Sequence, residues 1–518
     1  MGGATETAFL AVAGAVVIWD VVVAGHAGRA PGRAEWFRWI TAFAALLLVP
    51  AAVVAVADSS LTTARITSGI AWLWPLTLAL AAVQAGGAMV ARLVSPAIAI
   101  PLVAWNVTLA LVAAGRLYAD AGTTAPLWLA TLGAAEMQAL GRVTGDGALT
   151  SPVAILPPLM APVYRTPWRG GVAVRAAVAL LAAVGVAAIA REIRSAAAAI
   201  HSYDRFATQS LQERPRGDFA IGVRILPTVR EAPAPYALRM DLGVVDSIGA
   251  RAVLVVVDPR AHGPAMDSLG RVLDTYRRDS VVVIVAVGNA PRAVRTSADD
   301  RDALRERLAF VDQVARRLHP QYLLPEPPDG DNGGRSIETR EELLARTAVV
   351  AHAVNARIRV GASLRPGIAA DSALYAWATP SDSPVDAIGF AIAPGFAGAS
   401  TIDAQLAIAA RWMRAATGAP REHWVWAATT APVVHGELSQ RRALHGLLAW
   451  ATSHATVNGL IVSSAGDYDA ATGLRATSGR LRPAVEMLTR AIDALSDTRA
   501  PPAPAAIVAP APGPVPAR

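Results

Sequence analysis

The amino-acid sequence predicts a helical transmembrane domain followed by an α/β barrel of eight parallel strands. Up to about residue 190, the 518-residue chain consists of long apolar runs rich in Ala, Val and Leu, with charged residues mainly between the runs. This is the pattern of membrane-spanning helices. After residue 218, short apolar strand patterns alternate with amphipathic helix patterns, which indicates parallel βαβ units. Eight such units over about 280 residues match a closed (β/α)8 barrel in number and size.

Six spans are expected in the membrane domain, residues 1–190. A run of about 17–25 apolar residues is long enough to cross a bilayer as a helix. A further segment, residues 151–162, is apolar but contains four prolines, so we expect a re-entrant or interfacial piece there rather than a seventh span. The six expected spans are residues 8–25, 40–57, 70–90, 97–114, 126–140 and 172–190.

The number of spans decides on which side of the membrane the rest of the chain lies. With six spans, the arginines after the first span and those between the last two spans share one side, which the positive-inside rule makes cytoplasmic. The barrel is then periplasmic or extracellular, on a multi-pass protein of the inner (cytoplasmic) membrane. Seven spans would place the barrel in the cytoplasm. The first span does not resemble a cleavable signal peptide, because no basic residue precedes it.

Four polar residues within the predicted spans need an explanation: Asp20, Asn106, Glu136 and Gln138. A carboxylate at membrane depth is by default a functional-site hypothesis. The alternative is that Asp20 and Glu136 lie near span ends or contact a neighbouring helix.

The composition excludes several kinds of chemistry. The chain has no Cys, which excludes thiol catalysis, disulfides and Cys-type zinc sites. It also has no Lys, which excludes a P-loop lysine and a pyridoxal-phosphate Schiff base. No paired-His or EF-hand spacing occurs, so no metal and no cofactor are expected. The arginines are scattered among Asp and Glu, so no nucleic-acid partner is expected.

The barrel is expected at residues 219–496, after a polar connecting helix at 191–218. An open doubly wound sheet is the alternative, which is disfavoured because no Gly-rich phosphate turn follows the first strand. Residues 497–518 are rich in Pro and Ala, which predicts a disordered tail. The predicted strands are 219–226, 252–258, 281–287, 321–325, 358–364, 387–393, 424–427 and 460–464, and the predicted helices are 265–278, 301–318, 339–355, 402–417, 438–452 and 481–495.

Barrel enzymes place their chemistry at the carboxyl ends of the strands, so the residues there are the candidates for a site. A polar cluster is expected after the second strand, and aromatic side chains after later strands suit a sugar-stacking surface. The alternatives are an ordinary turn after the second strand and aromatic caps of the core. The candidate substrate-binding residues are Asp258, Arg260, His262, Phe396, Trp426 and Tyr468.

Three strand segments resemble retaining glycoside hydrolases of the large (β/α)8 superfamily, clan A. Residues 319–326, His-Pro-Gln-Tyr-Leu-Leu-Pro-Glu, resemble the fourth strand of that superfamily, which ends in an Asn-Glu-Pro-like sequence whose Glu is the acid/base. Residues 386–396 resemble the sixth strand, and residues 459–468 the eighth. The resemblance covers roughly residues 219–496 and implies that Glu326 acts as the general acid.

The chain departs from the superfamily pattern at two places. Pro325 stands where Asn is usual, and the predicted seventh strand, Trp424-Val-Trp-Ala-Ala-Thr-Thr, lacks the nucleophilic Glu. Retaining chemistry needs two carboxyl groups about 5–5.5 Å apart, and inverting chemistry tolerates about 6.5–9.5 Å. Glu437 and Asp467 are the candidates for the second carboxylate. The alternatives are that Glu437 complements a helix dipole, that Asp467 lies in a turn and that Glu326 is a surface loop residue.

The sequence leaves three functions open. The first is a membrane-anchored protein of the bacterial envelope that binds or processes a polysaccharide. Glu326 is its general acid if there is turnover, and the protein is a pseudoenzyme if there is none. The second is a non-enzymatic accessory or assembly subunit that uses a degenerate barrel to contact other membrane subunits. The third is transport through the membrane domain with the barrel as sensor, which rests only on Asp20 and Glu136.

Overall fold

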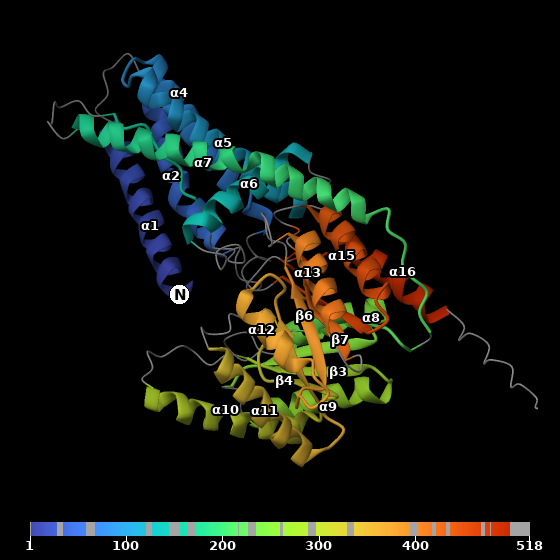
Figure 1. The fold of residues 1–518 in the computed structure, drawn as a ribbon. Helices are drawn as coiled ribbons and strands as arrows, with labels where there is room; N and C mark the ends of the chain where they lie inside the picture. The colour runs from blue at the N-terminus through green and yellow to red at the C-terminus, as the bar shows by residue number, and fades with distance from the viewer. Residues whose placement is uncertain are drawn as a thin grey trace, which may run out of the picture.

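A computed structural model shows an amino-terminal bundle of apolar helices joined to a closed barrel (Figure 1). The residues that it describes are 2–27, 35–57, 68–120, 127–144, 156–163, 171–215, 217–225, 235–259, 263–288, 297–328, 336–393, 401–416, 421–430, 432, 436–467, 472–476 and 478–497. The predicted tail therefore lies outside the described residues, except for its first position.

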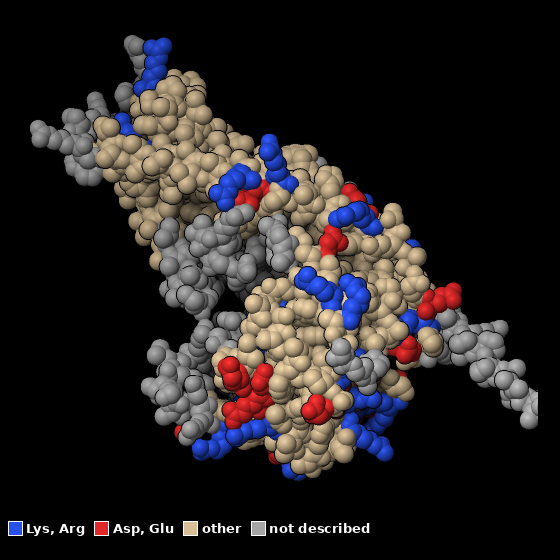
Figure 2. Space-filling model, in the orientation of Figure 1, with Lys and Arg blue, Asp and Glu red and all other residues tan. Residues whose placement is uncertain are grey.

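Helices stand at the positions of all six predicted spans. Among the described residues, α2, α4, α5 and α7 are long and apolar enough to cross a membrane, and α1 contains a shorter apolar stretch, Ala13–His26. Length and composition thus support four of the six predicted spans. The face shown in Figure 2 has few charged side chains over this part and many over the barrel. The helices are α1 (Gly2–Ala27), α2 (Glu35–Ala57), α4 (Leu73–Val90), α5 (Pro96–Asp120), α6 (Leu127–Thr144) and α7 (Gly171–Phe206), with the short turn η2 (Ser68–Ile70) before α4.

The proline-rich segment has no regular secondary structure where the structure describes it, at residues 156–163. The amide group of Gln84 on α4 donates to the Ala161 carbonyl oxygen at 3.2 Å and accepts from the Ala161 N–H at 2.8 Å. Asn106 on α5 holds Leu159 in the same two-way manner, at 2.9 and 3.0 Å. Non-helical backbone at membrane depth needs such partners because no water is there to bond it. These residues form no seventh helical span.

The other polar side chains of the helical bundle also contact neighbouring segments. Asp20 on α1 accepts a hydrogen bond from the Met160 N–H at 2.8 Å. Glu136 on α6 forms an ion pair with Arg116 near the end of α5, and Gln138 accepts from a serine of α7. The contacts of Glu136 and Gln138 join one helix to another, as the simpler of the two sequence interpretations expects for Glu136, whereas Asp20 contacts the non-helical segment 156–163.

The barrel consists of eight parallel strands. Each strand pairs with the next, and β1 pairs with β8, so the open-sheet alternative is excluded. The strand ends differ from the predicted ones by no more than three residues. The strands are β1 (Ala220–Ile225), β2 (Ala252–Val257), β3 (Val282–Val287), β4 (Tyr322–Leu324), β5 (Arg359–Leu364), β6 (Ala387–Ile392), β7 (Glu422–Thr429) and β8 (Val457–Ser463).

A ring of helices covers the outside of the barrel (Figure 1). Six of them were predicted, whereas α8 and α12 were missed. α12 has only ten residues, too few to show a helical period, and α8 contains Gly243, which lowers helix propensity. The helices are α8 (Pro235–Ile248), α9 (Gly263–Arg278), α10 (Ser297–Leu318), α11 (Ile337–Val354), α12 (Ala369–Ala378), α13 (Ile402–Ala415), α15 (Glu437–Thr452) and α16 (Pro483–Asp497).

Two tryptophans of β7 fill the interior of the barrel. Side chains alternate across a strand, so Trp424 and Trp426 both face inward, where they are 2% and 0% exposed. Glycines on other strands make room for them: a Cβ added at Gly361 or Gly389 would overlap the Trp426 ring, and one added at Gly459 would overlap Trp424. The interior is therefore a packed core, as is usual for barrels of this size.

His423 of β7 points the other way, into the apolar layer between the strands and the helices. Its ring stacks on Phe390 of β6, with centroids 5.7 Å apart, and its Nε2 lies 3.1 Å from the hydroxyl of Tyr375 on α12. Burial in this layer lowers the pKa of His423 from 6.5 to about 4. The imidazole is thus neutral in the folded protein at pH 7.

We expect the barrel to lose stability as the pH falls from about 6.5 to about 4. In this window the unfolded chain binds a proton at residue 423 and the folded chain does not. The contribution of His423 to the free energy of unfolding is therefore complete above pH 6.5 and is lost as the pH falls toward 4. At about 1.4 kcal/mol per pKa unit, the loss is roughly 3 kcal/mol. His423→Gln should remove this part of the pH dependence in urea unfolding. Equal pH dependence in the wild type and His423→Gln would disprove it.

Candidate functional site

The carboxyl ends of the strands form one rim of the barrel, and only part of the predicted site lies in the described residues there. Asp258, just after β2, is half-buried. The other predicted members of the polar and aromatic surface, except Trp426, lie outside the described residues. They are Arg260, His262, Phe396 and Tyr468.

Glu326 belongs to a buried ion cluster after β4. Glu326 lies two positions beyond the end of β4, whose Tyr322 and Leu324 face the barrel interior with the tryptophans. Its Oε2 accepts from Nε of Arg340 on α11 at 3.0 Å. Nη1 of the same guanidinium donates to Asp371 at 2.5 Å. One arginine thus holds two carboxylates, and Glu326 is 6% exposed rather than a surface loop residue.

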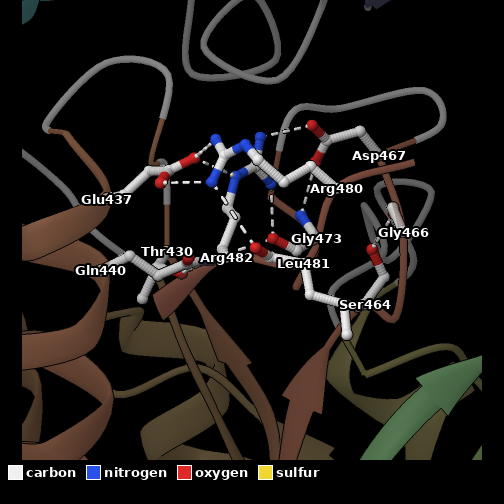
Figure 3. Close-up of polar contacts among 10 residues, drawn as sticks. All are labelled: Thr430, Glu437, Gln440, Ser464, Gly466, Asp467, Gly473, Arg480, Leu481 and Arg482. Carbon is white, nitrogen blue, oxygen red and sulfur yellow. Dashed lines mark hydrogen bonds and ion pairs between the residues drawn. The ribbon is translucent and has the colours of Figure 1, made fainter. Parts of the chain in front are cut away.

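Glu437 and Asp467 lie together in a second cluster, after β7 and β8 (Figure 3). Arg482, just before α16, donates to both carboxylate oxygens of Asp467, at 2.8 and 2.6 Å, and through Nε to Glu437 at 3.3 Å. Arg480 donates to both oxygens of Glu437. The backbone N–H of Gly473 also donates to Asp467 at 2.8 Å. The two candidates for a second carboxylate are therefore joined to each other by a buried arginine.

Further buried arginines fasten the same rim. Arg307 on α10 donates to the carbonyl oxygen of Pro325 at 3.0 Å, just after β4, and to that of Gly288 at 3.1 Å, just after β3. Arg475, in the segment between β8 and α16, donates to Asp241 on α8 at 2.9 Å. Guanidinium groups suit this work because they present several donors in a fixed plane. The rim is held to the helix layer by arginines at several strand ends.

Trp426 requires a correction to the predicted sugar-binding surface. It was expected to stack against a sugar, but its side chain is fully buried between β5 and β6. One residue, Val425, separates it from Trp424, so both occupy inward positions, below the rim rather than on it. The alternative interpretation, an aromatic core residue, describes it correctly.

Sequence reasoning missed the arginines that hold the carboxylates. Arg340 lies in the first turn of α11 and is 2% exposed, and Arg482 directly precedes a helix-starting proline and is also 2% exposed. A charged residue in the first turn of a helix usually faces water, so the pattern gives no sign that these two are buried. Asp371 was missed with them because α12 was not predicted.

A groove of about 340 Å³ lies on the outer side of the barrel, between the end of α7 and helices α13 and α15. Phe206, Leu406 and Trp450 contribute apolar walls, and Arg414 contributes a charge. None of the candidate carboxylates lines it. Among the described residues, no group of three or more His, Asp and Glu side chains is placed to hold a metal ion.

Comparisons with known proteins give structural likeness only. No family model and no curated protein sequence matches the chain. Solved structures similar to it include a GH5_18 protein from Bifidobacterium longum subsp. longum, with 11% identity, a TM-score of 0.42, and coverage of 55% of this chain and 81% of that one.

Two others are a β-glucosidase from Thermotoga maritima in complex with deoxynojirimycin (10% identity, TM-score 0.41, covering 55% and 99%) and endo-glycoceramidase II from Rhodococcus sp. (10%, 0.38, covering 54% and 81%). The similar structures are thus glycoside hydrolases, the group that the strand motifs resemble. Likeness at this level does not say what the chain binds.

Proposed function

We propose that this protein is a membrane-anchored barrel that binds a carbohydrate without hydrolysing it. The binding site is the rim formed by the carboxyl ends of the strands. One observation carries the proposal: Glu326, Glu437 and Asp467 each accept hydrogen bonds from buried arginines. Paired carboxylates and guanidiniums offer acceptors and donors in fixed directions, which suits hydroxyl groups. The strand motifs that resemble glycoside hydrolases support a carbohydrate as the ligand class.

The ion pairs argue against turnover. A general acid must hand a proton to the leaving oxygen, and the second carboxyl must attack or activate water. Oε2 of Glu326 already accepts from Arg340, and both oxygens of Asp467 already accept from Arg482. To attack or to activate water, Asp467 would have to give up hydrogen bonds from a buried arginine, which would leave that charge poorly paired.

The location of the barrel is part of the proposal. Arginines after α1 and between α6 and α7 share one side in the six-span arrangement, which makes that side cytoplasmic. We therefore place the rim on the periplasmic or extracellular side of a bacterial inner membrane, with lipid and a saccharide as its partners.

Full-length protein in nanodiscs should bind oligosaccharides from a panel of β-glucans and related polymers, and release no reducing sugar from them. Glu326→Gln should weaken calorimetric binding about tenfold, because it removes one charge-assisted hydrogen-bond acceptor at the rim, equivalent to about 1.4 kcal/mol. Glu342→Gln on the exposed face of α11 is the matched control and should bind as the wild type does.

Release of reducing sugar that disappears in Glu326→Gln would contradict the proposal and restore the hydrolase. No binding across the panel, together with stable co-purification of other membrane subunits in mild detergent, would favour the accessory-subunit alternative.

A further inference from the structure

The connection between membrane domain and barrel determines which way the rim faces. In a (β/α)8 barrel each outer helix begins near the carboxyl end of the strand before it and ends near the opposite face. α13 begins at Ile402 after β6, and α15 begins at Glu437 after β7. The first turns of these two helices therefore mark the rim that carries the ion clusters.

α7 reaches the barrel at this rim. Arg205, in its last turn, forms an ion pair at 2.7 Å with Asp403 in the first turn of α13. The neighbouring Asp204 forms an ion pair with Arg442 in the second turn of α15. Figure 1 shows the last part of α7 lying beside α13 and α15, with the apolar helices along its earlier part.

The chain then runs toward the opposite face of the barrel. The N–H of Gln212 donates to Thr452 at the end of α15 at 3.2 Å. Arg214 donates to the carbonyl oxygen of His454, beyond that end, at 2.9 Å. The order of contacts along the chain thus runs from the rim to the far side. The membrane-spanning part of α7, which precedes these contacts, lies on the rim side.

The attachment is close and has no flexible linker. α7 is one helix of 36 residues. Arg191 is the first charged residue after its expected span, and Asp204 follows about 13 positions later, a distance of roughly 20 Å along a helix. Its last residue, Phe206, packs on Gly446 of α15 so tightly that a Cβ there would overlap the ring. The rim is therefore held near the membrane surface in a fixed direction.

We infer that the ligand of the rim is the saccharide head of a lipid embedded in the same membrane, rather than a free polysaccharide. This rests on the proposed function and adds the substrate class to it. A saccharide anchored in the bilayer meets a rim held beside that bilayer at a high effective concentration, and a rigid attachment preserves this gain. A rim that served soluble polymers would gain nothing from facing the membrane.

The orientation is tested first, with full-length protein in nanodiscs that contain lipids carrying a nitroxide on the headgroup. The chain has no Cys, so Ser336→Cys and Arg357→Cys each give one labelling site. Both positions are exposed and flank α11, at the rim and at the far face. A fluorophore at position 336 should be quenched more strongly than one at 357. Equal quenching, or stronger quenching at 357, overturns the inference whatever the protein binds.

The ligand is tested with nanodiscs that contain glucosyl and diglucosyl diacylglycerol, against the same sugars free in solution. Apparent affinity should be at least tenfold higher for the lipid-linked form. Equal affinity, or binding of the free form alone, overturns this inference and leaves the proposed function standing. If the protein binds neither form and binds no sugar of the panel, both the proposed function and this inference are overturned.

A matched pair of glycine variants tests the role of the attachment. Gly446→Ala places a methyl group against Phe206, whereas Gly243→Ala on α8 meets nothing within 4 Å. Gly446→Ala should reduce the preference for the lipid-linked sugar while free-sugar affinity stays the same, and Gly243→Ala should change neither. An unchanged preference in a Gly446→Ala protein whose α7 contacts are shown to be displaced contradicts the inference.

Discussion

Arg482→Met lowers the free energy of unfolding of the barrel by about 3–5 kcal/mol, because it leaves Asp467 and Glu437 without their shared cation. The two carboxylate side chains are 3% and 9% exposed, so water cannot replace the guanidinium fully. The loss also removes one of two hydrogen bonds to the Gly473 carbonyl oxygen, which accepts from Arg482 at 2.5 Å and from Gln440 at 3.1 Å. The change is expected in urea unfolding followed by circular dichroism in detergent.

Two further variants separate charge from geometry. Arg482→Lys keeps the charge but not the planar set of donors, so its stability should fall between those of the wild type and Arg482→Met. Arg490→Gln removes an exposed ion pair with Glu486 on α16 and should change stability by no more than about 0.5 kcal/mol. A loss below about 1 kcal/mol for Arg482→Met would mean that the cluster is not a structural one.

Trp426→Ala is expected to cost about 3–5 kcal/mol, the range for removing a large buried aromatic side chain. The facing residues on β5 and β6 are Gly361 and Gly389, which have no side chain to move into the space. Thermal unfolding of the full-length protein is the measurement. Trp36→Ala, at a membrane-domain tryptophan that is 45% exposed, is the control and should leave barrel unfolding nearly unchanged.

The converse substitution tests the same packing. Gly389→Ala puts a methyl group into the Trp426 ring and should destabilise the barrel by roughly 1–3 kcal/mol, as overpacking does. Combined with Trp426→Leu, the added methyl group should fill part of the vacated space, so the double variant should be more stable than the sum of its single effects predicts. Strict additivity would show that residues 389 and 426 do not share one space.

The sequence predicted the barrel well because each strand can be recognised from its own residues. A buried parallel strand is a continuous apolar run, as in Ala252–Val257 of β2 and Ala387–Ile392 of β6, and such a run needs no knowledge of its partners. The lack of a helix at residues 156–163 was predictable in the same local way, because the prolines at residues 157, 158 and 162 are incompatible with a regular helix.

The site was less predictable because its contacts join residues far apart in the chain. Glu326 was identified from the sequence around it, but its partner Arg340 is on the next helix and Asp371 is on the one after that. Glu437 and Asp467 were separate candidates, 30 positions apart, until Arg482 placed them in one cluster. Arg340 follows the same helical spacing as exposed arginines and Arg482 stands just before a helix, so no local pattern distinguishes these two from exposed arginines.

The sequence by itself determined the apolar helical domain, the eight strands and the absence of a carboxylate at the end of β7, because hydropathy and residue identity are local properties. Only the tertiary structure decided that the remaining carboxylates are engaged by buried arginines, that the β7 tryptophans fill the barrel, and that the end of α7 docks on α13 and α15. These three features depend on which side chains meet across strands and helices. The closure of the barrel and its docking onto α7 determine those contacts.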